Sequence, residues 1–136
     1  MEGEKKTGKE AKKILEQTEY GDFYIKSFDF NFLEHTVTMH VVAAPYDKTL
    51  RRYIDKHYIV RFTNVSKFKL EKSEDSVDEP WEGLWWASIA YIPEEKDSLY
   101  ISEEEKREYD FLIEGDPFVM FIKGNLEVEP YEPEQA

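Results

Sequence analysis

Three histidines are the side chains best suited to acid–base or metal chemistry in this chain of 136 residues. His35 and His40 lie five positions apart in or beside a segment of alternating hydrophobicity, so we expect them to point to opposite faces of a strand. His57 begins a different predicted strand, and no spacing typical of a metal site, such as HExxH or HxH, occurs. The pattern favours surface histidines and no metal ligand. One alternative stays open, a site assembled in three dimensions from His40, His57 and a carboxylate.

Carboxylates are the next candidates, but a catalytic pair needs one buried member whose pKa is raised. Asp29 and Asp110 each lie between aromatic residues, and the alternation of the sequence places both on the solvent face of a strand. The chain has no GxSxG, P-loop or GxGxxG motif, and it has only six glycines. We therefore expect no catalytic residue and no cofactor, and a binding protein fits the sequence better than an enzyme.

Charge is distributed unevenly along a chain whose net charge is −12. Residues 47–72 carry eight basic against three acidic side chains, whereas residues 94–116 carry three basic against ten acidic ones. This is either an ordinary solvated surface or an acidic face that attracts a basic protein, because opposite charges speed association. Exposed tryptophan is typical of protein interfaces. The predicted contacts with a basic partner are Trp81, Glu94, Glu95, Asp97, Glu103, Glu104 and Glu105.

Two further functions stay open. A pocket in a curled sheet, with the polar residues His40, Arg61 and Ser88 on its strands, would indicate a small-ligand-binding or hydrolytic domain. Alternatively, the apolar second face of residues 84–92 would join copies of the chain into a homo-oligomer. Nucleic acid is not an expected partner, because the negative net charge repels phosphate.

The local patterns predict a single, mainly β domain over residues 1–136. We expect a curled antiparallel sheet, a sandwich or a partly open barrel, because hairpin-length connections leave no room for the long crossovers of parallel strands. One N-terminal helix is predicted at residues 9–17, with Ala11, Ile14 and Leu15 as its apolar stripe and its end near Gly21. Residues 1–8 and 130–136 are predicted to be flexible tails.

Residues 22–43 are predicted to form a hairpin. Its aromatic and aliphatic residues change phase at Lys26-Ser27, and a β-bulge there would bring five of them to one side: Phe23, Ile25, Phe28, Phe30 and Phe32. Residues 45–56 are interpreted as a basic connection, either with or without a helical turn. The strand at Tyr58 either continues past Asn64 to Leu70 or stops at a turn, and residues 118–128 form either one strand with a glycine bulge at Gly124 or two with a tight turn.

Composition indicates a cytoplasmic protein. The chain has no cysteine, which excludes a disulfide framework and thiolate metal ligands. Residues 1–6 carry no apolar run of the kind that a signal peptide needs. The most apolar uncharged run, residues 83–93, is too short to span a bilayer, so no membrane partner is expected.

Residues 22–70 resemble the small YxiG-like proteins of bacilli. The resemblance rests on the hairpin FYIKSFDF followed by VTMHV and on the segment VRFTNVSKF. Members of that group are suspected of immunity roles beside polymorphic toxins. The resemblance therefore implies an immunity-type inhibitor, and it supplies no catalytic motif that could be placed on this chain.

Overall fold

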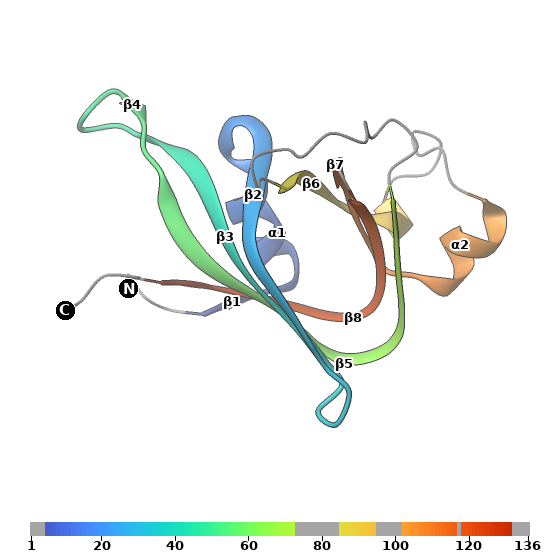
Figure 1. The fold of residues 1–136 in the computed structure, drawn as a ribbon. Helices are drawn as coiled ribbons and strands as arrows, with labels where there is room; N and C mark the ends of the chain where they lie inside the picture. The colour runs from blue at the N-terminus through green and yellow to red at the C-terminus, as the bar shows by residue number, and fades with distance from the viewer. Residues whose placement is uncertain (1–4, 73–84, 95–101, 117, 132–136) are drawn as a thin grey trace.

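The computed structural model describes residues 5–72, 85–94, 102–116 and 118–131. Its strands form one antiparallel sheet in the order β1-β8-β5-β3-β2-β6-β7, in which β7 pairs with β8 as well and so brings the two sides of the sheet together into a partly closed ring (Figure 1). The strands are β1 (Lys6–Thr7), β2 (Thr18–Asn31), β3 (Thr36–Asp47), β4 (Arg52–Tyr53), β5 (Lys56–Lys72), β6 (Trp85–Tyr91), β7 (Phe111–Asp116) and β8 (Phe118–Pro130). The prediction of a single curled antiparallel sheet is confirmed.

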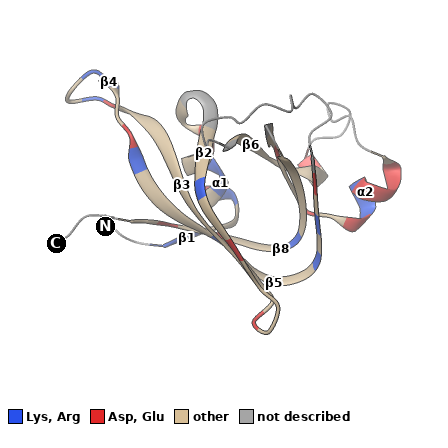
Figure 2. Ribbon diagram, in the orientation of Figure 1, with Lys and Arg blue, Asp and Glu red and all other residues tan. Residues whose placement is uncertain are grey.

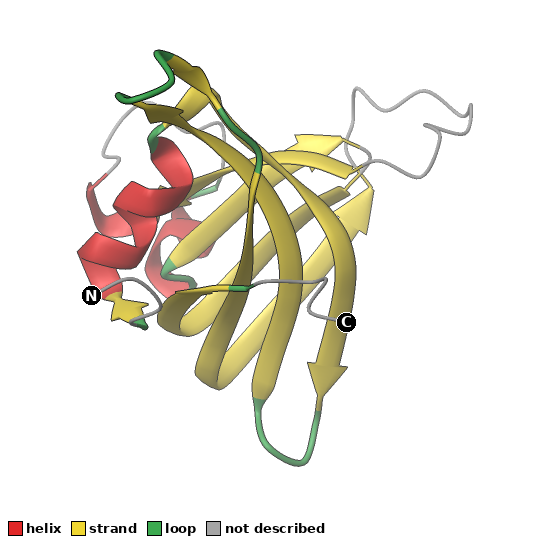
Figure 3. Cartoon of the chain, turned by 90° about the vertical axis from the view of Figure 1, so that its left-hand side faces the viewer, coloured by secondary structure: helices red, strands yellow, loops and turns green. Residues whose placement is uncertain are grey.

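The helix α1 (Gly8–Glu16) covers one side of the sheet, and Figure 3 shows the strands curling beside it. Ala11 and Leu15 of its predicted apolar stripe are fully buried, and Ile14 packs against the same core. The helix ends earlier than predicted, because Gln17 closes it with a hydrogen bond from its N–H to the Lys13 carbonyl and Thr18 already begins β2. Lys6 and Thr7, placed by the sequence in a polar tail, form β1 against β8.

The predicted bulge between β2 and β3 is present. The pairing register shifts between Ile25 and Ser27, and Phe28 and Phe30 beyond it pack against the same core as Phe23 and Ile25 before it. Phe32 lies in the turn and is 79% exposed, and it contacts only the edge of this group, through the Phe30 ring at 4.6 Å between centroids. The inner face of the ring is thus apolar along most of β2, and it encloses the main core of the molecule.

Residues 45–56 contain no helix, and residues 48–51 form the turn between β3 and β4. Instead β3 extends to Asp47 and pairs with β4, as Figure 1 shows at the end of the molecule marked β4. Asp47 accepts a hydrogen bond from the Leu50 N–H, 2.8 Å from N to Oδ1, which stabilises the turn. The rings of Tyr46 and Tyr53 meet across the pair at 5.3 Å, a contact that favours a hairpin arm over a helix.

The sequence left open whether β5 and β8 are each one strand or two. Both are continuous in the structure, and both bend at the same place. The β5–β8 register shifts between Thr63 and Lys67, where three residues of β5 lie opposite Gly124 alone. Asn64 adopts a left-handed conformation there, with φ of 52°. A Cβ on Gly124 would lie 2.8 Å from the Thr63 carbonyl oxygen, so only glycine permits this close approach of the strands.

The outer face of the ring carries a second, smaller core. Ile92, Leu112 and Phe121 are buried there, with Tyr109 beside them. The chain therefore covers part of the apolar second face of β6 itself, although Trp86 on that face is 42% exposed. Two short helices flank this cluster, the 3-10 helix η1 (Ile92–Glu94) and α2 (Glu103–Glu108). Ser102 begins α2 through a capping box with Glu105.

Candidate ligand-binding cavity

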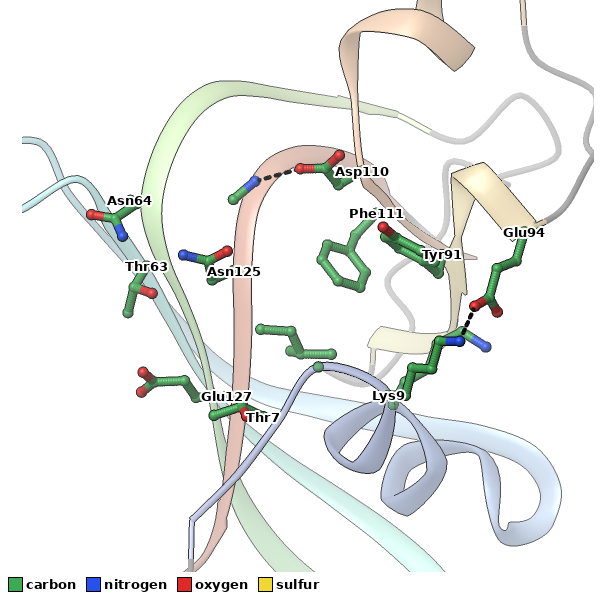
Figure 4. A pocket seen from close by; sticks show the side chains of 14 residues that line it. Thr7, Lys9, Thr63, Asn64, Tyr91, Glu94, Asp110, Phe111, Asn125 and Glu127 are labelled. Atoms are coloured by element: carbon green, nitrogen blue, oxygen red, sulfur yellow. Dashed lines mark hydrogen bonds and ion pairs between the residues drawn. The ribbon is translucent and has the colours of Figure 1, made fainter.

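A cavity of about 670 Å³ lies where the bent strands meet the beginning of α1. Five separate segments line it: the β1–α1 junction, the bulge of β5, the end of β6 with η1, the beginning of β7 and the middle of β8. Figure 4 shows their side chains arranged around one common space. This volume lies within the range of small-molecule sites in proteins.

Aromatic and aliphatic groups form the apolar part of the cavity wall. Phe111 and Leu126 belong to the main core and are almost fully buried. The Tyr91 ring lies against Phe111, with 5.3 Å between the ring centroids. Because these residues are fixed by the packing of the core, the cavity has a rigid apolar surface on which a ligand's carbon skeleton can rest.

Asp110 is the best-anchored polar residue of the cavity. Its carboxylate Oδ2 accepts a hydrogen bond from the Gly124 N–H at 3.2 Å. Its backbone is held on both sides, because its carbonyl accepts from the Ile92 N–H and its own N–H donates to the Ile122 carbonyl. The other carboxylate oxygen, Oδ1, has no hydrogen-bond partner among the described residues, so it is available to a ligand.

The ionic groups at the cavity rim are already paired. The Lys9 ammonium lies 3.2 Å from the Glu94 carboxylate, as the dashed line in Figure 4 marks. Lys12 pairs with Glu16 on the same helix. Glu127 lies 3.4 Å from the Lys5 ammonium and 4.0 Å from the Arg61 guanidinium. These pairs leave little net charge for recognising an ionic ligand.

Neutral side chains supply the hydrogen-bonding groups that remain. Thr63 and Asn64 come from the bulge of β5, and Asn125 follows Gly124 on β8. Within the described part of the chain, none of the three side chains makes a hydrogen bond. The bulge thus places a hydroxyl and two amides at one end of the cavity, where each still has its full bonding capacity.

The residues that the sequence suggested for a pocket do not line this cavity. His40 lies on the outer face of β3, where its Nε2 is 2.7 Å from Nδ1 of His57. Arg61 pairs with Glu127 and Glu129 on β8. Ser88 lies on β6 opposite Glu114 of β7. The structure does not bring these three residues together.

The predicted acidic contact residues are partly engaged within the chain. Glu105 accepts a hydrogen bond from the Lys69 ammonium, and this bond holds the pKa of Glu105 below its usual value. Glu103 pairs with Lys106 at 3.5 Å, and Glu94 pairs with Lys9. Figure 2 shows acidic and basic residues mixed on α2, where Glu104 is exposed. Trp81, Glu95 and Asp97 lie outside the described residues, and the basic protein partner stays a prediction.

The cavity residues gave only weak signals in the sequence. Alternation along the strand places Asp110 on a solvent face, whereas in the structure its carboxylate accepts a hydrogen bond from Gly124 at the bend of β8. Asn64 and the Gly124-Asn125 pair were visible as interruptions of two strands. Bulges often lie beside binding sites, but only the pairing of β5 with β8 shows that the two interruptions coincide.

Fold and cavity together define the chain as an antiparallel, partly closed β-ring with one covering helix and a cavity at the bend of its strands. Comparison with known protein families, with curated proteins and with solved structures gives no match to this chain. None of the helices in the described part of the chain has the length and apolar character needed to cross a membrane.

Proposed function

We propose that this chain is a binding protein for a small, uncharged, polar organic molecule, held in the cavity between β5, β8 and α1. One observation carries the proposal. A cavity of about 670 Å³ combines a rigid apolar wall, built by Phe111 and Leu126, with neutral polar side chains that have no partner among the described residues. Pockets of this composition are typical of small-molecule sites, where apolar surface supplies affinity and a few polar groups supply orientation.

Charge complementarity favours a neutral ligand. An anionic ligand would have to displace Glu94 from Lys9, or Glu127 from its two cationic partners. Among the described cavity residues, a cationic ligand finds only the Asp110 carboxylate, which a backbone N–H already holds. A neutral ligand with hydroxyl or amide groups can instead bond to Asn125, to Thr63 and to the second oxygen of Asp110 without disturbing those pairs. The aromatic pair of Tyr91 and Phe111 then packs against the ligand's carbon atoms.

Binding is better supported than catalysis. Two of the three carboxylates in the cavity, Glu94 and Glu127, are engaged with cations, and the third, Asp110, is held by a backbone N–H. No histidine is among the residues that line the cavity. A general base acts together with groups that position and polarise the substrate. Among the described residues the second oxygen of Asp110 is free, but the residues that line the cavity bring no histidine beside it, and their cations are already paired.

The test is an NMR screen of the ¹⁵N-labelled chain against a fragment library divided into neutral polar, anionic and cationic members. We expect hits in the neutral polar set, with amide shifts concentrated at Thr63, Tyr91 and Asn125. The substitution Asn125→Ala should weaken these hits, since it removes an amide that faces the cavity. Ser66→Ala, at an exposed position of β5 that does not line the cavity, is the matched control and should leave the hits unchanged. Hits that map elsewhere, or a library with no neutral binder, would overturn the proposal.

A further inference from the structure

The outer face of the sheet holds a pair of histidines on neighbouring strands. Met39 and Val41 on either side of His40 are buried in the ring, as is Tyr58 next to His57, so both imidazoles lie on the opposite face. In the β3–β5 ladder His40 pairs with Ile59 and His57 pairs with Val42, which makes the histidines diagonal neighbours. His40 Nε2 lies 2.7 Å from His57 Nδ1, and the ring centroids are 5.0 Å apart.

This geometry brings two ring nitrogens within hydrogen-bond distance of each other. Imidazole binds zinc at about 2.0–2.1 Å, so two nitrogens on one ion lie roughly 2.9–3.3 Å apart in square-planar or tetrahedral coordination. The observed separation is 2.7 Å, so the nitrogens have to move a few tenths of an ångström apart, and both rings have to turn by roughly 40° so that their lone pairs meet at the ion. In the hydrogen-bonded pair one ring donates its N–H to the other. For both rings to bind the metal, the donor ring has to move this proton to its other nitrogen. This change of tautomer leaves both rings neutral.

The surroundings hold the two rings in place. The Tyr131 ring meets the His40 ring edge-on, with 4.9 Å between centroids, and the Tyr131 N–H donates to the His57 carbonyl at 3.0 Å. Burial, together with the positive charges of His57 and Lys26, lowers the pKa of His40.

The charged neighbours of the two histidines include a cation, which opposes metal binding, and a carboxylate, which favours it. Lys26 opposes the approach of a cation to His40. Glu129 lies on the same face, because it pairs with Ile59 in the β5–β8 ladder, and its carboxylate is 3.7 Å from Arg61. Over the described residues no third histidine or carboxylate completes a cluster of metal ligands. Water has to fill the remaining positions, so the site is suited to a moderately bound ion rather than a structural one.

We propose that His40 and His57 form a two-histidine site for a divalent transition-metal ion, which binds Cu²⁺ most tightly and Zn²⁺ less tightly. Imidazole nitrogen suits these ions, whereas Mg²⁺ and Ca²⁺ prefer oxygen ligands. The order of the two ions follows the general stability order of divalent metals with nitrogen ligands. The site is independent of the cavity, since neither histidine lines it.

The test is a titration of the full chain, without a histidine tag, with Cu²⁺ and with Zn²⁺. We expect one Cu²⁺ per chain in calorimetry and hyperfine coupling to two nitrogens in electron paramagnetic resonance, with Mg²⁺ giving no signal. His40→Gln and His57→Asn place an amide near the bonding nitrogen but supply no imidazole, so each should weaken Cu²⁺ binding by at least about tenfold. His35→Asn is the matched control, because His35 is exposed in a turn with φ of 56°, a conformation that asparagine tolerates.

Several outcomes would overturn the proposal. These are wild-type affinity in His40→Gln or His57→Asn, an equal loss in His35→Asn, or coupling to a single nitrogen. If a strand variant does not fold, the wild-type chain still decides the question. Substoichiometric Cu²⁺ should broaden the NMR signals of residues around His40 and His57 and spare those around His35, and the reverse pattern would reject the site.

Discussion

Asp110 and Gly124 are joined across the cavity by a hydrogen bond of 3.2 Å from the Gly124 N–H to the Asp110 carboxylate. The bond ties the beginning of β7 to the bend of β8, at the point where a side chain on Gly124 would collide with Thr63. The shape of the cavity therefore depends on one carboxylate and one glycine, and neither acts through bulk hydrophobic packing.

Replacing Asp110 with alanine should lower the free energy of unfolding by about 1–2 kcal/mol, because a partly buried N–H at Gly124 loses its acceptor. Asp110→Asn retains an acceptor oxygen and should lose much less. Urea unfolding followed by tryptophan fluorescence measures both. Asp29→Ala, at an exposed position, is the control, and an Asp110→Ala variant as stable as this control would show that the bond contributes nothing.

Two glycines provide a contrast between collision and backbone strain. A Cβ on Gly115 of β7 would lie 1.9 Å from the Trp86 carbonyl oxygen and 2.8 Å from the Ala87 Cα, so β6 has to move. We expect Gly115→Ala to cost about 3 kcal/mol, at the upper end of overpacking effects. Gly8 has open space but φ of 56°, so Gly8→Ala should cost only about 1–2 kcal/mol through backbone strain.

Thermal and urea unfolding under the same conditions measure the loss in free energy of unfolding for each glycine variant. The ranking is the informative result. If Gly8→Ala were the more damaging substitution, the close contact between β6 and β7 at Gly115 would be wrong.

Much of the fold could be predicted because its signals are local. The phase change at Lys26-Ser27 predicts a bulge, which the register shift after Ile25 confirms. Ser102 and Glu105 have the spacing of a capping box, and both of its hydrogen bonds are present. In such cases a few neighbouring residues determine the structure, so it can be derived from the sequence alone.

The sequence did not predict the cavity, and it left a site of His40 and His57 only as an open alternative, because both depend on register between distant segments. Alternation shows that His40 faces away from the core, but only the offset of β3 against β5 brings its nitrogen to His57. In the same way, Asn64 and Asn125 line one cavity only because the extra residues of β5 lie opposite Gly124. A sequence pattern with period two determines the face of a residue and leaves its cross-strand neighbour open.

The hairpin arm offers a local test of the structure. Tyr53→Ala removes the ring that meets Tyr46, a contact worth about 0.5–1.5 kcal/mol. Among the strands that the structure describes, β4 pairs only with β3, so the loss should loosen the arm and leave global unfolding almost unchanged. Hydrogen exchange should quicken at Ile54, whose N–H donates to the Pro45 carbonyl at 3.1 Å. Tyr53→Phe keeps the ring and should keep the protection of the Ile54 N–H. If Ile54 exchanges equally slowly in Tyr53→Ala and in Tyr53→Phe, the contact between the Tyr46 and Tyr53 rings does not stabilise the arm.

The contact between Glu105 and Lys69 predicts a pH dependence of stability. The hydrogen bond from Lys69 is the largest cause of the lowered pKa of Glu105. Because the folded pKa lies below the unfolded value, this stabilisation is fully present above the unfolded pKa of 4.5 and is lost as the pH falls through the folded value. Lys69 is more than a third exposed, so the contribution should stay below about 1 kcal/mol and shrink further in high salt.

Glu105→Gln isolates the charge, because glutamine can still accept the capping hydrogen bonds from Ser102 that Glu105 accepts in the wild-type chain. Unfolding free energies of the wild type and this variant, measured from pH 6 down to pH 3, should differ most at the upper end and converge below the folded pKa, since both side chains are then uncharged. Glu104→Gln, at an exposed neighbouring position of the same helix, should run nearly parallel to the wild type. A Glu105→Gln curve that does not approach the wild-type curve as the pH falls would show that the ionic contact with Lys69 does not stabilise the fold.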